Sequence, residues 1–336
     1  MITTLRGKDY IATQDWATEE LDTIIDVAHD LKRSFALGAP TRLLPDKTLF
    51  MIFFDKSTRT RNAFEAGMTQ LGGHAHDLTP DMMQISHGES PKDTGIILSR
   101  YGHGLAIRHD LEPGAGDSYM REVARYADTP VINLQSDIDH PTQTIADLMT
   151  IREKFPDGVR GLKVAVSWAY APSYAKPMSV PQGLIGLMTR FGMRVTLAHP
   201  PEYTLMSHVV EDARRNAEES GGTFETVNDM DAAFEDADIV YPKSWGIEAL
   251  FSHPQEALAI SARYQDWICD ERRMALARRH AIYMHCLPAD RGYEVTDAVI
   301  DGPQSVVYDE AENRLHTAKA IMALTMGGKG GPGEHA

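Results

Sequence analysis

Residues 48–54 read TLFMIFF, a continuous apolar run that follows the breaker region Gly38–Pro40. Such a run is typical of a strand that is buried on both faces, as in a parallel sheet. Shorter runs follow at 105–107 and 131–134, with helical patterns between them. Upstream, apolar residues at helical spacing between Leu21 and Phe35 predict a helix that Thr18 caps. The alternation of strands and helices predicts an α/β fold.

A second series of strand-like runs follows further along the chain. We therefore expect two doubly wound parallel-sheet domains of similar size, over residues 1–150 and 151–310. A final helix at 311–326 is expected to pack back on the first domain. The runs of the second series are 162–168, 194–199, 222–227, 238–245, 282–288 and 305–310.

Composition excludes several classes of protein. The 336 residues carry a net charge of −15, which argues against non-specific binding to nucleic acid or to an anionic membrane. Cys269 and Cys286 are the two cysteines, so a disulfide scaffold is excluded, and a reduced, cytoplasmic setting is expected. No run approaches the roughly 20 apolar residues that span a bilayer, and residues 1–16 lack the apolar core of a signal peptide.

The loop after the run 162–168 argues against a dinucleotide site. No GxGxxG follows that run, so the tight turn that admits a pyrophosphate is missing. Pro172, Pro177 and Pro181 instead predict a long, stiff loop. Such a loop lies at the carboxyl end of a strand, where α/β sheets bind ligands.

The strongest local signal is STRTR at 57–61, directly after the first buried strand. Ser57 is placed to cap the following helix, whose N-terminus offers N–H groups and a positive dipole end. Hydroxyls and a guanidinium beside those groups make a cradle for a phosphate. The alternative is an ordinary helix cap followed by two solvated arginines.

Other candidate residues also lie at strand ends or helix starts. Each has a structural explanation when taken alone: a surface arginine, a capping turn or a buried, inert cysteine. A zinc site is not supported, since Cys286 and His285 stand in no pattern of four ligands. In α/β domains, strand ends converge on one cleft, which favours a shared site. These candidates are Arg108, His140, Gln143, Lys243, Trp245, His285, Cys286 and Arg314, the last placed at the start of the final helix.

Four ordered motifs resemble the aspartate/ornithine carbamoyltransferase family. They are STRTR (57–61), HPTQ (140–143), HCLP (285–288) and DEAENRLH (309–316), and their spacing matches along nearly the whole chain. The resemblance implies transfer of a carbamoyl group from carbamoyl phosphate to a small amine, without metal or cofactor. It also implies a cytoplasmic homotrimer whose active sites are shared between subunits.

The resemblance assigns a role to each matching residue. The chemistry agrees, because attack on a carbonyl builds oxyanion charge that Arg108 and His140 can stabilise, and no protein nucleophile is required. By resemblance, the phosphate is held by Ser57, Thr58, Arg59 and Thr60. The carbonyl is polarised by Arg108 and His140, the amide is held by Gln143, and the carbamoyl group and the amine are surrounded by Cys286, Leu287 and Arg314. The amine site is completed by Trp168, Lys243, Trp245 and Pro288, and Gln84 reaches into the neighbouring subunit.

Departures from the ornithine type point to a subfamily. Lys243 stands where ornithine enzymes carry the Asp that binds the α-ammonium, and a lysine repels an ammonium. SVPQGLIGLMTRFGM (179–193) and DADIVYPKSW (236–245) resemble the knotted branch, which implies a trefoil-type knot in the second domain. Within that branch the chain lacks the arginine of acetylornithine enzymes after HCLP, and Glu294 replaces one of their lysines.

The sequence leaves three functions open. The leading hypothesis is a knotted carbamoyltransferase for an amine that carries a carboxylate. An ornithine carbamoyltransferase is the alternative within the same class, because the HGES…KDT loop (87–94) looks ornithine-like. A non-catalytic binding protein on the same scaffold is the alternative from another class, and the complete set of expected phosphate-site residues argues against it.

Overall fold

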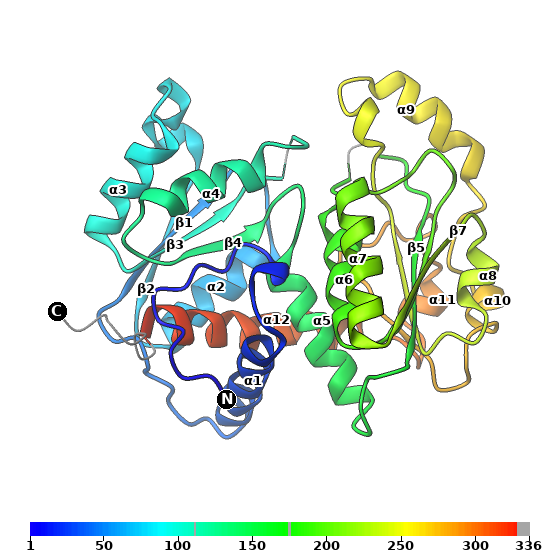
Figure 1. Ribbon diagram of the computed structural model, residues 1–336, viewed down its shortest axis with the longest axis horizontal. Helices are drawn as coiled ribbons and strands as arrows, with labels where there is room; N and C mark the ends of the chain where they lie inside the picture. The colour runs from blue at the N-terminus through cyan, green and yellow to red at the C-terminus, as the bar shows by residue number, and fades with distance from the viewer. Residues whose placement is uncertain (111, 174–175, 328–336) are drawn as a thin grey trace. The chain divides into compact units, whose positions relative to one another are not determined.

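The computed structural model describes residues 1–110, 112–173 and 176–327. The chain folds into two compact units (Figure 1). One unit comprises Met1–Ala146 and the residues from Glu312 onward, and the other comprises Asp147–Ala311. The unit boundaries fall inside two helices, α5 (Pro141–Lys154) and α12 (Val307–Met322). The predicted boundaries after residues 150 and 310 fall inside the same helices, and the functional division that they mark stays a prediction.

The first unit is built on a parallel four-stranded sheet in the order β2-β1-β3-β4. β1 lies between two partners, and Leu49, Met51, Ile52 and Phe53 are buried. This confirms the doubly covered strand that the run TLFMIFF predicts. The strands are β1 (Thr48–Phe53), β2 (His74–Leu78), β3 (Gly104–Arg108) and β4 (Val131–Gln135).

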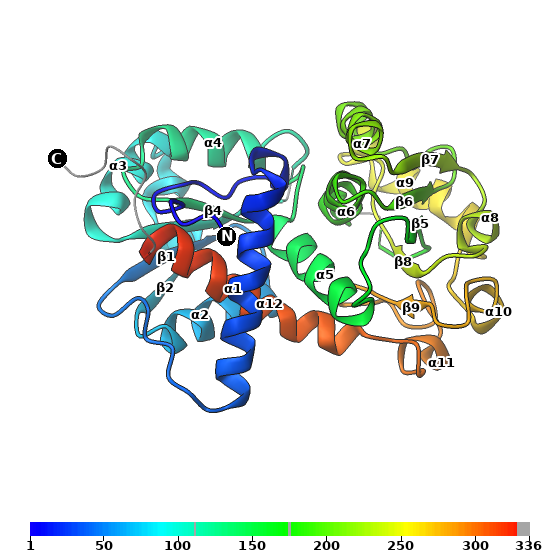
Figure 2. The ribbon, with the colours of Figure 1, turned by 60° about the horizontal axis from the view of Figure 1, so that its bottom comes forward.

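Helices cover both faces of this sheet. α3 and α4 lie side by side on one face, and α2 lies on the other face with α12 beside it (Figure 2). α2 and α12 approach closely, since a Cβ at Gly67 would lie 2.9 Å from Cε of Met322. The C-terminal helix is thereby joined to the first unit. The other helices are α1 (Thr18–Ala36), α2 (Arg59–Gln70), α3 (Pro91–Tyr101) and α4 (Gly116–Tyr126), and a π-helical turn (Ala323–Gly327) follows α12.

The second unit has its own parallel sheet of five strands in the order β7-β6-β5-β8-β9. The direction of winding reverses beside β5, so this sheet is doubly wound like the first. Both units therefore have the predicted α/β class. The elements are β5 (Lys163–Trp168), α6 (Ser179–Arg190), β6 (Arg194–Ala198), α7 (Ser207–Ser220), β7 (Thr223–Val227), α8 (Met230–Phe234), β8 (Ile239–Lys243), α9 (Pro254–Ser261), α10 (Glu271–Met274), β9 (Ile282–Tyr283) and α11 (Asp297–Ile300).

Two expected strands differ from the structure. Residues 305–310 do not form a strand, because α12 already begins at Val307 and only Ser305 bridges to Tyr283. The segment 282–288 is a strand over two residues only, Ile282–Tyr283. The early start of α12 also means that Arg314 lies in its second turn rather than at its beginning.

Two expected helix caps were also wrong. Thr18 is the first residue of α1. The N–H of Ala17 instead donates to the carboxylate of Glu20 at 2.8 Å. Ser57 does not cap α2, whose N-cap position is Thr58 and which has no side-chain cap.

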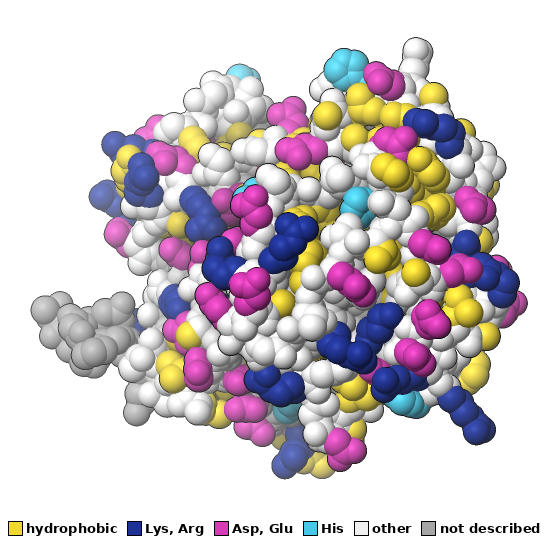
Figure 3. Space-filling view, turned by 45° about the vertical axis from the view of Figure 1, so that its right-hand side comes forward, with side chains coloured by type: hydrophobic (Ala, Val, Ile, Leu, Met, Phe, Trp, Pro, Cys, Tyr) yellow, Lys and Arg dark blue, Asp and Glu magenta, His cyan; other side chains and the backbone are white. Residues whose placement is uncertain are grey.

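The described surface is mixed in charge. On the face shown in Figure 3, acidic side chains lie among the basic ones, which form no continuous stripe there. None of the helices in the described residues is both long enough and apolar enough to cross a membrane.

Candidate active site

The first group of predicted site residues follows β1 and enters α2. Thr60 is buried in the first turn of α2, Arg59 is partly buried beside it, and Thr58 is exposed. No side chain caps this helix, and the N–H groups of a first helical turn have no acceptor within the helix itself. The dipole end and these N–H groups suit an anion such as phosphate.

Arg59 and Arg61 have different environments although both belong to STRTR. Arg61 pairs with Asp77, and its guanidinium lies 4.0 Å from the ring centre of Phe53. Arg59 instead acts electrostatically on His140. The two arginines of the motif therefore differ in role. Arg61 packs on the sheet, and Arg59 belongs to the candidate site.

His140 lies at the start of α5 and is buried. Burial and the positive charges of Arg314, Arg108 and Arg59 hold its pKa well below the usual value. The imidazole is therefore neutral at pH 7, so its ring can donate one hydrogen bond or accept one without carrying charge. Four residues that the sequence predicted for the site thus belong to one electrostatic cluster in the first unit. They are His140 and the arginines Arg59, Arg108 and Arg314.

Two contacts fix members of this cluster. Arg314 donates a hydrogen bond from Nη2 to Oγ1 of Thr60. Arg108, at the end of β3, makes a two-point ion pair with Asp110. Gln143 is buried, and its backbone N–H donates to the backbone carbonyl of His140 at 2.9 Å.

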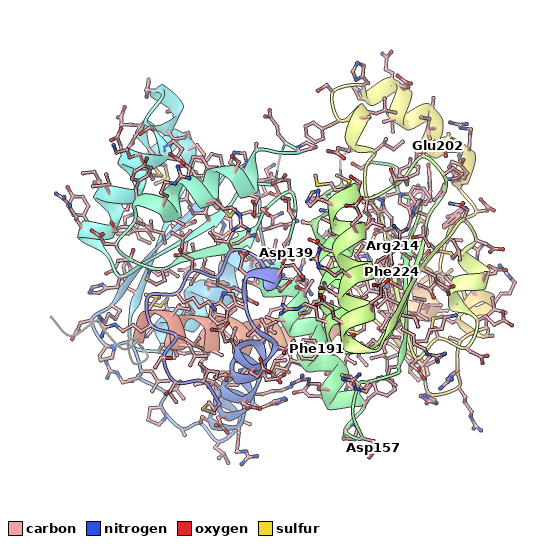
Figure 4. The ribbon with its side chains drawn as sticks, in the orientation of Figure 1. Asp139, Asp157, Phe191, Glu202, Arg214 and Phe224 are labelled. Carbon is pink, nitrogen blue, oxygen red and sulfur yellow. The ribbon has the colours of Figure 1, made fainter. Side chains whose placement is uncertain are left out.

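The N-terminal segment holds the loop that carries His140. Oδ2 of Asp139 accepts from the N–H and the hydroxyl of Thr13 at 2.9 and 3.0 Å, in the loop between β4 and α5 (Figure 4). Tyr10 pairs with Ile132 beside β4, and its hydroxyl donates to the carbonyl of Pro141. The backbone on both sides of His140 is therefore anchored.

Gln84 belongs to the segment between β2 and α3. It begins the 3-10 turn Gln84–His87 and is exposed. An exposed side chain on a surface turn is compatible with a contact to another subunit, and this role stays a prediction.

The second group of predicted residues belongs to the second unit. Cys286 is buried, and burial raises the pKa of its thiol to about 11, while Lys243 lowers it by a smaller amount. The thiol is therefore protonated at pH 7 and is a poor nucleophile. Leu287 adopts φ +55° and precedes the cis Pro288. A positive φ at a leucine is strained, and such strain is concentrated at functional sites.

His285, a candidate from the sequence, forms a buried pair with Glu294 that the sequence did not predict. Nδ1 of His285 accepts from the N–H of Leu287 at 2.9 Å, so the proton of the neutral ring is on Nε2, which lies 3.4 Å from Oε2 of Glu294. Glu294 also accepts from the N–H groups of Ser244 and Asp290 at 2.6 and 2.7 Å. Its carboxylate therefore joins the end of β8 to the HCLP loop.

Lys243 is buried, and a carboxylate lies near it that the sequence around Lys243 does not suggest. Its ammonium donates to the carbonyl of Ser244 at 2.6 Å. Although burial favours the neutral acid, the nearby His285, Lys243 and Lys176 hold the pKa of Glu294 far below its usual value. The charge of Lys243 is thus partly compensated by a buried carboxylate.

Trp168 and Trp245 are packed as structural residues. Nε1 of Trp168 donates to the carbonyl of Trp245 at 3.0 Å, and Nε1 of Trp245 donates to the carbonyl of Tyr203 at 2.9 Å. Both indoles are 1% exposed. Their indole donors are already used, and their place in the amine site stays a prediction.

No group of three or more potential metal ligands occurs among the described residues. Sequence reasoning missed Asp110, Asp139 and the pairing of Glu294. Asp110 is two residues from Arg108, but this spacing alone does not predict an ion pair.

Comparison with known proteins agrees with this arrangement. The carbamoyl-phosphate-binding domain model of the aspartate/ornithine carbamoyltransferases matches residues 8–153, and the aspartate/ornithine-binding domain model matches residues 176–325. The chain therefore belongs to the aspartate/ornithine carbamoyltransferase family and is a carbamoyltransferase, as its four motifs predict.

The names of its relatives refer to different substrates. The chain is 41% identical to YgeW of Escherichia coli K12, a carbamoyltransferase by name, over 95% of this chain and 89% of that one. It is 40% identical to an ornithine carbamoyltransferase of Thermococcus kodakarensis over 98% and 99% of the two chains. An acetylornithine transcarbamylase complexed with acetylcitrulline has a TM-score of 0.88 at 36% identity, over 95% of this chain and 99% of that one.

Proposed function

We propose that this carbamoyltransferase moves the carbamoyl group of carbamoyl phosphate to the amine of a carboxylate-bearing, amino-acid-like substrate. The products are a ureido compound and phosphate. The observation that carries the proposal is the buried, neutral His140 within the field of Arg59, Arg108 and Arg314. This cluster combines positive charge for a phosphate with a neutral donor for a carbonyl oxygen.

The residues have distinct tasks in this reaction. Arg59, Thr60 and the uncapped start of α2 bind the phosphate, which gains charge as it leaves. Arg108 and His140 stabilise the oxygen that becomes negative when the amine attacks the carbonyl carbon. Gln143 holds the carbamoyl amide, and Arg314 is anchored on Thr60 next to the phosphate. The remaining rate enhancement comes from holding the two substrates in one reactive geometry.

For the second substrate, we assign Lys243, Cys286, Leu287 and Pro288 to the amine site, with Trp168 and Trp245 behind them. A protonated Cys286 and a strained Leu287 offer a thiol and a backbone carbonyl to the incoming amine. The knot, the cytoplasmic location and a homotrimer that shares its sites through Gln84 are further parts of the proposal. The resemblance to the knotted branch supports them.

Ornithine stays a candidate substrate because of one observation. The charge of Lys243 lies near the buried carboxylate of Glu294, so Lys243 repels an α-ammonium less than an isolated lysine would. Relatives named ornithine carbamoyltransferase, at about 40% identity, also favour this candidate.

The test measures phosphate release from carbamoyl phosphate with a panel of amines. The panel contains ornithine, N-acetylornithine, N-succinylornithine and other amines that carry a carboxylate, with a blank for spontaneous breakdown. The proposal expects one of the carboxylate-bearing amines to raise release well above the blank and to yield a ureido product by mass spectrometry. If no amine does so while carbamoyl phosphate binds, the proposed substrate class is wrong.

A further inference from the structure

Arg108 is held by Asp110 in a side-on ion pair. Nε donates to Oδ1 at 3.1 Å, and Nη2 donates to Oδ2 at 2.9 Å. The side chain of Asp110 is 1% exposed and that of Arg108 is 13% exposed. A two-point pair of this kind fixes the plane of the guanidinium, which a single contact does not.

This pair leaves part of the guanidinium available. A guanidinium has five N–H donors, and the fork uses one on Nε and one on Nη2. The Nη1 group and the second N–H of Nη2 are outside the fork. The charge of Arg108 also lowers the pKa of His140, so the two residues belong to one electrostatic cluster.

Asp110 also sets the charge of the cluster. Arg59, Arg108 and Arg314 are positive, His140 is neutral and Asp110 supplies one negative charge. These five groups together carry a charge of +2, which matches the dianion of an acyl phosphate such as carbamoyl phosphate.

We propose that Asp110 is a positioning residue: its carboxylate aligns the Arg108 guanidinium with His140, so that both meet the carbonyl group of carbamoyl phosphate. The inference rests on the proposed function, because it assumes that this cluster binds that substrate. Asp110 itself does not touch the substrate. Its removal should therefore weaken recognition of the carbonyl group and leave the phosphate contacts in place.

Two stable probes separate these contacts without need of the amine. Phosphonoacetamide has a methylene in place of the bridging oxygen of carbamoyl phosphate, and it keeps the carboxamide. Methylphosphonate lacks the carboxamide and keeps the phosphonate. Dissociation constants of both probes are measured by calorimetry for the wild type, Asp110→Asn and Asp110→Glu.

The wild type should bind phosphonoacetamide more tightly than methylphosphonate. In Asp110→Asn, the dissociation constant of phosphonoacetamide should rise by about tenfold, the order expected when one aligned charge-assisted contact is lost. That of methylphosphonate should stay the same or fall, since the cluster gains positive charge. Asp110→Glu keeps the charge and should recover part of the discrimination, and it remains informative if the Asn variant does not fold.

Asp137→Asn is the matched control. Asp137 is a buried acid of the neighbouring loop that accepts from the N–H groups of Gly114 and Asp117, at 2.6 and 2.8 Å. Its loss should lower the melting temperature and leave the ratio of the two dissociation constants unchanged. A purely structural Asp110 would behave in the same way as this control, which would overturn the inference.

The remaining outcomes are equally decisive. Tighter binding of both probes by Asp110→Asn would mean that Asp110 competes with the ligand, and the inference would be wrong. Unchanged binding of both would also reject it. If the wild type itself does not distinguish the two probes, the proposed role of Arg108 and His140 fails, and the inference falls with it. The first two results reject the inference alone.

Discussion

Arg314 of α12 donates a hydrogen bond to the Thr60 hydroxyl of α2, two residues that are 254 positions apart in the chain. Thr60 belongs to the predicted phosphate site, and Arg314 acts electrostatically on His140. The last helix therefore contributes a charged group to a site whose other members come from the first half of the chain.

The two arginines of STRTR give a matched pair for mutagenesis. Arg59→Ala should reduce kcat/KM for carbamoyl phosphate by about a hundredfold or more, because a charge-assisted phosphate contact is lost in the transition state. Arg61→Ala should keep most of the activity and lower the melting temperature, since Arg61 pairs with Asp77 and lies on Phe53. Equal losses of activity in both variants would contradict the assignment of Arg59.

In the proposed homotrimer, a shared active site predicts complementation between inactive variants. Arg59→Ala and Gln84→Ala trimers, dissociated and reassembled together, should regain part of the wild-type activity. Hybrid trimers contain interfaces at which both wild-type residues meet. Native mass spectrometry verifies that hybrids form. The idea is abandoned if both parents are inactive and verified hybrids stay inactive.

The buried thiol of Cys286 should be slow to alkylate. Its pKa is raised from 9.0 to about 11 by burial, so at pH 8 it holds about a hundredfold less thiolate than an ordinary thiol. Iodoacetamide labelling followed by peptide mass spectrometry should show a rate that increases about tenfold per pH unit between pH 8 and 10. The denatured protein is the control, and fast labelling of the folded protein at pH 8 would refute the expectation.

Specificity at Lys243 should depend on Glu294. Replacing Glu294 by Gln removes the compensating charge near Lys243, so use of an amine with a free α-ammonium should fall by about tenfold relative to its acylated analogue. The measurement is the ratio of kcat/KM for ornithine to that for N-acetylornithine, in wild type and Glu294→Gln. An unchanged ratio would show that Lys243 does not face the α-nitrogen.

The wild type provides the complementary measurement. Since Lys243 stands where ornithine enzymes carry an Asp, we expect free ornithine to be a poorer substrate than an amine with a masked α-nitrogen. A kcat/KM for ornithine of about 10⁴ M⁻¹s⁻¹ or more, an ordinary enzymatic efficiency, would make ornithine carbamoyltransferase the better description.

Asp139 predicts a pH dependence of stability. Burial raises its pKa from 3.8 to about 6, so between about pH 4 and 6 the folded chain keeps a proton that the unfolded chain has lost. This contribution to the free energy of unfolding therefore falls as the pH rises through that window. Asp139→Asn cannot ionise, so its stability relative to wild type should increase from pH 4 to pH 7, by up to about 3 kcal/mol. Urea unfolding at both pH values measures this, and an equal difference at each would contradict it.

Sequence patterns predicted β1 from its uniformly apolar residues, and the edge strand β7 was predicted as well. The run TLFMIFF is apolar throughout because β1 is covered on both faces. β2 (HAHDL) was missed because it is an edge strand whose positions are exposed or half-buried, so its sequence is polar. SVVYDE resembles a strand locally, but Val306 and Val307 are buried at the start of a helix instead.

For the candidate site, the motifs predicted which residues carry charge and not what those residues contact. Lys243 was interpreted as a positive charge that repels an α-ammonium, without a carboxylate near it. The carboxylate that compensates it, Glu294, is 51 positions away and becomes its neighbour only through the fold. Partners of this kind are set by tertiary packing, which a single sequence does not encode in any local pattern.

The first unit takes its residues from both ends of the chain, and this determines how the protein can be cut. A fragment that stops before Glu312 lacks Arg314 and Met322, and with them a member of the cluster around His140 and the side chain that packs on Gly67. During synthesis, the phosphate-binding half therefore stays incomplete until nearly the whole chain has left the ribosome. A circular permutant that joins the two termini would make this unit continuous in sequence.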